Sequence, residues 1–291
     1  MRETEANSQR YSRIYQLMQW RKYKEASEEA MKLIREEPEE PDAFALMGHI
    51  SLRMSNCGQA LHWSDEALRR DPEHSLAWFV RTNAYYDMQN WPAAKEAIGH
   101  AQRFDPYEPH YYFLLSNISN RNGKFAEAKE YLLKGLDIAP ENALYLANLS
   151  YIEALLRNKA ESKLLSAEAL RLGTEEDHVY LYLAWAAEQR GEYDEGMNLL
   201  KDAIRLDPDN KQIREEFLEA LQKSYKLYRI LLWPGKQLRK MKPWQVLICW
   251  IVLWLVFRPF VLVFIILYGI THWVTKLLVH VKVFGWTRRR S

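Results

Sequence analysis

Few residues of this 291-residue chain are arranged for catalysis or for metal binding. It has eight histidines and two cysteines, Cys57 and Cys249, but no His-Glu-x-x-His pattern and no cysteine pair at ligand spacing. Glycine motifs that cradle phosphate or present a nucleophilic serine are also missing from the sequence. We therefore expect no catalytic residue, no metal site and no cofactor, and we do not expect an enzyme.

One column of side chains does offer binding chemistry. Asn83 and Asn117 lie 34 residues apart, and Tyr151 and Trp185 continue the column at the same interval. A side-chain amide carries a hydrogen-bond donor and an acceptor, so it can pair with the backbone of an extended peptide whatever the peptide's sequence. Nearby aromatic rings could hold the side chains of that peptide. The next question is which structural element repeats every 34 residues.

The same period runs through the first 210 residues. It carries prolines (Pro38, Pro72, Pro106, Pro140 and Pro208), small residues (Ala26, Ala60, Ala94, Ala128, Ser162 and Gly196) and large ones (Phe44, Trp78, Tyr112, Leu146 and Tyr180). Apolar residues three and four apart in 77–86 predict a helix with one buried stripe. Asn90 is a predicted N-cap, with Pro92 in the first turn of a second helix that Pro106 ends. Each period thus predicts two helices, which small residues allow to pack closely.

A 34-residue pair of helices with these columns resembles the tetratricopeptide repeat (TPR). Phe44-Ala-Leu-Met-Gly48, with Ala60, Ala67 and Pro72, is the best match. Six repeats fit, at 7–40, 41–74, 75–108, 109–142, 143–176 and 177–210, and a predicted capping helix follows at 211–228. The resemblance implies an all-α solenoid of helical hairpins, because each unit must bury its apolar face against a neighbour.

Three repeats depart from this pattern. The first has Arg10 and Arg13 at positions for large apolar residues, so its leading helix is either frayed or a polar cap. The third places Arg81 in an apolar column. The fifth has Lys159 and Ser162 in place of an aromatic residue and an alanine, so we expect looser packing there.

The resemblance also implies a function, since TPR proteins generally bind peptide segments or protein partners in a concave groove lined by the first helix of each pair. The residues expected to line it are Phe79, Asn83, Tyr86, Phe113, Asn117, Asn120, Tyr151 and Trp185. The alternative is that the asparagines are merely solvated and the rings pack between repeats. Arg81 and Arg121 do not form a convincing pair, so a clamp for a C-terminal carboxylate is not expected.

Charge divides the chain near Tyr228. Residues 229–291 contain 11 Lys and Arg and no Asp or Glu, whereas residues 1–228 carry a net charge of −9. Phosphate would repel the acidic part, so we expect no nucleic-acid partner, and no small-molecule substrate is predicted. The basic connector 229–243 is predicted to contact anionic lipid through Lys236, Arg239, Lys240 and Lys242.

Residues 244–275 have membrane composition, with Arg258 as their one charged residue. Arg258-Pro259 divides them into two short runs, which favours a helical hairpin, either spanning or re-entrant. The alternatives are one kinked span, a segment in one leaflet, and a buried hairpin of a soluble core. The connector and the tail 276–291 are both basic, so the repeats and the tail are predicted to lie on the cytoplasmic side of the membrane.

Together these patterns predict a membrane-anchored scaffold or adaptor that binds a peptide segment or protein partner at the cytoplasmic face. The alternative is an accessory subunit of a membrane transporter or enzyme complex, in which the hairpin is the working element. Arg258 and His272 would then act within the membrane. The first 40 residues contain no apolar run, so we expect no secretory signal.

Overall fold

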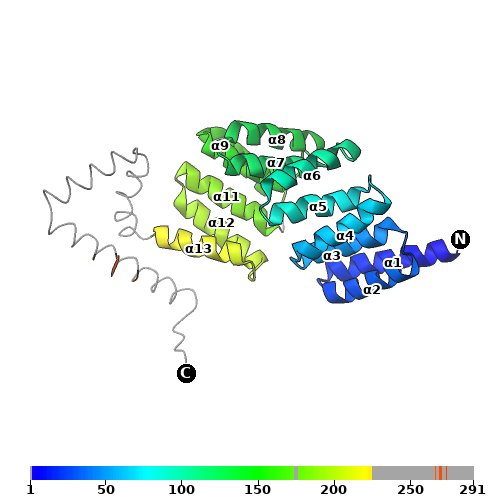
Figure 1. Cartoon of the computed structure of the whole chain (residues 1–291). Helices are drawn as coiled ribbons and strands as arrows, with labels where there is room; N and C mark the ends of the chain where they lie inside the picture. The colour runs from blue at the N-terminus through cyan, green and yellow to red at the C-terminus, as the bar shows by residue number, and fades with distance from the viewer. Residues whose placement is uncertain (1, 174–175, 225–265, 267–268, 271–272, 274–291) are drawn as a thin grey trace, which may run out of the picture. The chain divides into compact units, whose positions relative to one another are not determined.

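The computed structural model describes residues 2–173 and 176–224, and also residues 266, 269, 270 and 273 (Figure 1). Within residues 2–224 the described elements are thirteen α-helices and no strand. The predicted connector, the basic tail and most of the predicted hairpin lie outside the described residues. Among the helices that are described, none is long and apolar enough to cross a membrane.

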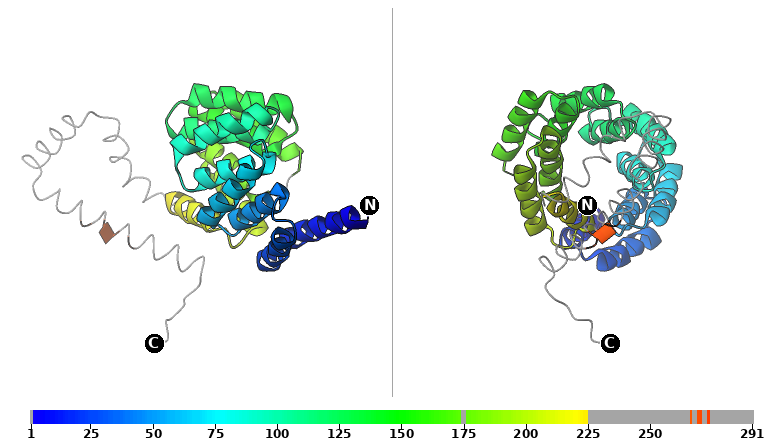
Figure 2. Two further views of the ribbon diagram at one scale, coloured as in Figure 1. Left: turned by 45° about the vertical axis from the view of Figure 1, so that its right-hand side comes forward. Right: turned by 90° about the vertical axis from the view of Figure 1, so that its left-hand side faces the viewer.

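The helices fall into two compact units that divide after Pro140. The first contains α1 (Arg2–Gln19), α2 (Tyr23–Glu36), α3 (Pro41–Arg53), α4 (Cys57–Arg70), α5 (Ser75–Asp87), α6 (Trp91–Phe104), α7 (Pro109–Arg121) and α8 (Phe125–Ile138). The second contains α9 (Ala143–Leu155), α10 (Lys159–Arg171), α11 (Asp177–Arg190), α12 (Tyr193–Leu206) and α13 (Lys211–Ser224). Figure 2 shows the helices of the first unit succeeding one another side by side in chain order.

The helices begin and end at recurring local signals. The side chains of Asn56, Asn90 and Asn142 each accept a hydrogen bond from a backbone N–H in the first turn of the next helix. Asn90 is therefore the N-cap that the sequence predicts, and Pro92 lies in the first turn of α6. Between the two helices of each pair one residue has a positive φ, at positions Arg21, Ser55, Gln89, Gly123, Arg157 and Gly191. The same turn is thus reused at the 34-residue period.

Small residues hold the helices of a pair close together, as their period predicts. Ala26, Ala60 and Ala94 are fully buried. A Cβ atom added to Gly48 would lie 3.2 Å from Cγ1 of Val80 and 3.4 Å from the backbone oxygen of Ala60 on the partner helix. A small residue therefore suits this close approach between the helices.

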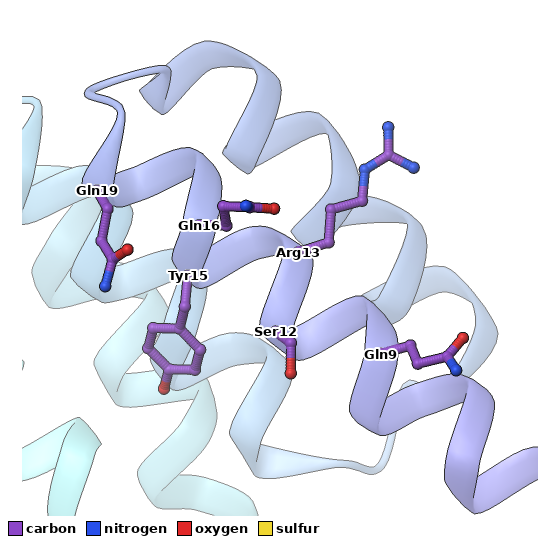
Figure 3. A pocket seen from close by; sticks show the side chains of 6 residues that line it. All are labelled: Gln9, Ser12, Arg13, Tyr15, Gln16 and Gln19. Carbon is purple, nitrogen blue, oxygen red and sulfur yellow. The ribbon is translucent and has the colours of Figure 1, made fainter.

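Helix α1 is formed from Arg2 to Gln19 and covers the end of the first unit. Its buried face presents Ile14 and Leu17 to α2 and α3, while Arg10 pairs with Glu36. An open hollow on its other side is lined by Gln9, Ser12, Arg13, Tyr15, Gln16 and Gln19 (Figure 3). This arrangement agrees with a polar cap and not with a frayed helix.

The expectation of loose packing around Ser162 is wrong. Ser162 is fully buried, and its hydroxyl accepts a hydrogen bond of 2.8 Å from Nη1 of Arg190. The Ser150 hydroxyl donates to the backbone oxygen of Ser162 at 2.8 Å, and Nζ of Lys159 donates to the backbone oxygen of Arg190 at 2.8 Å. A polar network therefore replaces the apolar contact of the other repeats, joining α9, α10 and α11.

Candidate partner-binding surfaces

In the first unit, Asn83 is held by hydrogen bonds on the first-helix surface. Its Nδ2 donates to the backbone oxygen of Phe79 at 2.8 Å, and its Oδ1 accepts from Nε2 of His110 at 2.9 Å. The side chain is half-buried. The amide is therefore oriented by its neighbours within the repeats.

Phe79 connects this amide to two histidines. Its ring centroid lies 6.1 Å from that of His49 and 5.2 Å from that of His110, which in turn lies 5.9 Å from the ring of Phe113. We call His49, Phe79, Asn83, His110 and Phe113 the amide–aromatic cluster. It draws on α3, α5 and α7, the first helices of three successive pairs.

The two histidines were missed by the sequence analysis. His49 occupies the same repeat position as Asn83, one period earlier, so the 34-residue period could have identified it. His110 occupies a different repeat position, so the period could not. Burial lowers the pKa of His110 to about 4. Burial also lowers the pKa of His49, and the charge of Arg53 lowers it further. Both rings are therefore neutral near pH 7, and the cluster presents an uncharged surface.

The remaining predicted residues of this unit lie beside the cluster. Tyr86 packs edge to face on Trp91, with ring centroids 5.4 Å apart. Burial raises the pKa of Tyr86, and a hydrogen bond with the side chain of Asn117 opposes the rise. Asn120 is half-buried near the end of α7. Arg121 lies over Trp91, and Arg81 pairs with Asp65, so these cations have separate partners, as the sequence indicated.

In the second unit, Tyr151 and Trp185 form part of an aromatic triad. The centroids of Tyr151 on α9 and Trp185 on α11 are 5.6 Å apart, and Tyr182 meets Trp185 at 5.3 Å with nearly perpendicular rings. Trp185 also lines a small hollow between α11, α12 and α13. The other lining residues are Ala184, Glu188, Tyr193, Gly196, Met197, Leu200, Glu216 and Ala220.

Comparison with protein-family models identifies the type of repeat. Two family models described as tetratricopeptide repeat match the chain, one at residues 109–142 and one at residues 177–220. The chain contains tetratricopeptide repeats. The first matched TPR comprises α7 and α8, and the second comprises α11, α12 and most of α13. Tetratricopeptide repeats serve as protein-interaction scaffolds, and both candidate surfaces include residues of a matched TPR.

Solved structures show the same all-α TPR solenoid. The structure of pilF from Pseudomonas aeruginosa is 17% identical, with a TM-score of 0.58 over 75% of this chain and 100% of that chain. A TPR protein from Parabacteroides merdae is 13% identical, with a TM-score of 0.60 over 76% and 88%. Yeast Tom70 is 16% identical, with a TM-score of 0.51 over 74% and 44%. These identities support a shared fold and confirm the predicted fold class of the repeats.

A curated relative matches part of the chain only. Protein O-mannosyl-transferase TMTC1 of Mus musculus is 24% identical over 142 residues. The match includes 47% of this chain, which spans about 15% of the length of that relative.

Proposed function

We propose that this chain is a TPR scaffold or adaptor that binds a peptide segment or protein partner through its first-helix surfaces. The observation that supports this is the amide–aromatic cluster. Its rings are half-buried and fixed against one another, so a partner would meet pre-positioned apolar anchors and lose little side-chain entropy. The eight predicted groove residues are part of this proposal.

The test is affinity capture with the full-length chain and a Phe79→Ala/Phe113→Ala variant. Phe104→Ala, at an exposed ring outside the cluster, is the matched control. We expect the cluster variant to lose the captured partner and the control to keep it, with circular dichroism confirming that both fold. Equal recovery by both variants would show that the cluster is not the binding surface.

We also propose that residues 229–291 attach the repeats to the cytoplasmic face of a membrane. The support is compositional: an apolar segment flanked on both sides by Lys and Arg, next to an acidic repeat domain. Deleting 229–291 should release the repeats from membranes while partner binding persists. Continued sedimentation of the deletion variant with membranes would refute the anchor.

A second candidate function is an accessory subunit whose hairpin is the working element. Arg258 within the apolar segment favours it, because intramembrane charges commonly mark functional sites. Loss of the complex's activity in an Arg258→Leu variant that still inserts and still captures its partner would support this candidate. We propose no catalytic role for the chain, although its mouse relative is named as a transferase.

A further inference from the structure

A second surface of the first unit is a groove lined by methionines. Its apolar lining comes from Met31 of α2, from Met47 and Met54 of α3, and from Trp63 of α4. Met47 is buried, Met31 and Trp63 are half-buried, and Met54 is 50% exposed. We call these four residues the methionine groove.

The methionine groove opens away from the amide–aromatic cluster. Successive residues of an α-helix are turned by about 100° around its axis. Met47 and Met54 are seven residues apart and therefore share one face of α3. His49 follows Met47 by two residues, which places it about 200° around the helix, on the opposite face. The groove is therefore separate from the first-helix surface that carries the cluster.

The next repeat fills the equivalent positions with a charged pair. Asp65 stands one period after Met31, and it forms an ion pair with Arg81 between α4 and α5. Arg81 stands one period after Met47, and its guanidinium also lies over the ring of Tyr85, 5.4 Å from the centroid. Thioethers cannot form such a bridge, and the methionine groove has a volume of about 500 Å³. A water molecule occupies about 30 Å³ in the liquid, so there is room for several apolar side chains.

The spacing of the groove residues fits a helix as the ligand. Met47 and Met54 lie two turns apart on α3, about 10 Å along its axis. Residues i and i+7 of a partner helix have the same separation, and residues i+3 and i+4 lie between them on the same face. Methionine side chains are flexible and polarizable, so they adapt to the apolar residues of such a face.

Two charged residues of α2 also line the groove and give its ligand a polarity. Glu28 and Arg35 are seven residues apart, which is two helical turns. In the described part of the chain neither of them makes an ion pair, whereas Lys32 between them pairs with Glu29 at 2.9 Å. A partner helix with a basic residue near Glu28 and an acidic residue near Arg35 would complement both charges.

We propose that the methionine groove binds an amphipathic helix of a second partner protein. The helix would insert apolar residues at i, i+3, i+4 and i+7, and it would carry a basic and an acidic residue seven positions apart along one edge. This inference goes beyond the proposed function, which concerns the first-helix surfaces. It gives the first unit two docking surfaces on opposite sides of α3, as an adaptor that joins two partners requires.

The probe is a fluorescein-labelled sixteen-residue peptide of alanine and glutamine. It has leucine at its fourth, eighth and eleventh positions, lysine at its fifth and glutamate at its twelfth. Binding to the full-length protein in lipid nanodiscs, which keep free detergent out of the groove, is followed by fluorescence anisotropy. Met54→Glu should raise Kd at least tenfold, because it places a charge beside the leucines. Met88→Glu, at a similarly exposed methionine one period later, should change Kd less than twofold.

The polarity of the groove has its own test. Arg35→Glu should raise Kd about threefold, and a second peptide with lysine in place of its glutamate should restore the affinity. Arg69→Glu changes the same charge one period later and should leave the affinity for both peptides unchanged. Thermal unfolding of each variant separates lost binding from lost folding.

Absence of peptide binding, or equal effects of Met54→Glu and Met88→Glu, would overturn the proposal. If Met54→Glu dissociates a dimer in analytical ultracentrifugation, the groove binds a second copy of the chain, which also overturns it. The Phe79→Ala/Phe113→Ala variant should bind the peptide as the wild type does. Peptide binding that is lost in that variant and kept in Met54→Glu would refute the methionine groove and leave the proposed function standing.

Discussion

Arg190 donates a hydrogen bond of 2.8 Å from Nη1 to the hydroxyl of Ser162, although 28 positions separate the two residues. The Arg190 side chain is 1% exposed, and its other guanidinium nitrogens pair with Glu192 and Glu195. At the positions equivalent to Ser162, earlier repeats have the fully buried alanines Ala60 and Ala94. The fifth and sixth helix pairs are thus joined by a buried ion instead of an apolar contact.

Replacing the buried guanidinium of Arg190 should destabilise the folded protein. Arg190→Met removes the guanidinium donor from the buried hydroxyls of Ser162 and Ser166 and from Glu195, while Glu192 keeps its pair with Lys163, so we expect the free energy of unfolding to fall by about 2–4 kcal/mol. Arg171→Met, which breaks an exposed ion pair with Glu168, should change it by less than about 0.5 kcal/mol. Urea denaturation measures both variants. Similar losses at the two positions would contradict a structural role for the buried network.

Two helical glycines should respond to alanine with opposite signs. A Cβ on Gly196 would lie 3.2 Å from the backbone oxygen of Ala184, so Gly196→Ala must shift one helix and should destabilise by about 1–2 kcal/mol. A Cβ on Gly99 meets nothing within 4 Å, so Gly99→Ala should stabilise by about 0.5–1 kcal/mol through helix propensity. Thermal unfolding of both variants checks the prediction, and a stabilising Gly196→Ala would refute the close approach.

The turns between paired helices offer a second comparison. Gln89 has φ of 57°, a conformation that strains residues with a Cβ, so Gln89→Gly should stabilise the protein by about 0.5–1 kcal/mol. Gly123 has φ of 73° at the equivalent turn, and Gly123→Ala should destabilise by about 1 kcal/mol. Chemical denaturation should therefore give changes of opposite sign. Two changes of the same sign would show that backbone strain does not govern these turns.

His110 should make stability depend on pH. Its pKa is about 4 in the folded protein and 6.5 when unperturbed, so between these values the unfolded state binds more protons. Stability is therefore lost as pH falls from 6.5 to 4. His110→Gln should remove this part of the pH dependence, and His178→Gln, at an exposed histidine, should retain it. Melting temperatures measured across pH 4 to 7 test this, and parallel curves for wild type and His110→Gln would contradict it.

Periodicity predicted the features that each repeat builds locally. The N-cap at Asn90, the small residue at Gly48 and the pairing of helices all depend on neighbours within one or two turns or on the adjacent helix. The polar network could not be predicted in this way, because it depends on where the long side chain of Arg190 reaches. The 34-residue period shows which positions are small or apolar. It does not show which rotamer a long side chain such as Arg190 adopts.

The candidate surfaces were predicted in part for the same reason. The Asn83 column placed the amide correctly on a first helix, but its hydrogen bond to His110 links two different columns. Tyr182 was missed because the equivalent positions of the second, third and fourth repeats are the buried apolar residues Leu46, Val80 and Leu114. The sequence also did not predict that the chain divides into two compact units between α8 and α9, because the 34-residue period continues across that point.

The polar face of α1 also bears on assembly. Repeat arrays grow when an exposed apolar end is covered by another unit, and copies that add head to tail without closing form open filaments. At this end of the first unit a second molecule would meet Gln9, Ser12, Arg13, Gln16 and Gln19 beside the half-exposed ring of Tyr15. Docking there would strip water from three amides and a guanidinium in order to bury one tyrosine ring. The polar face of α1 is thereby disfavoured as a site for fibre growth.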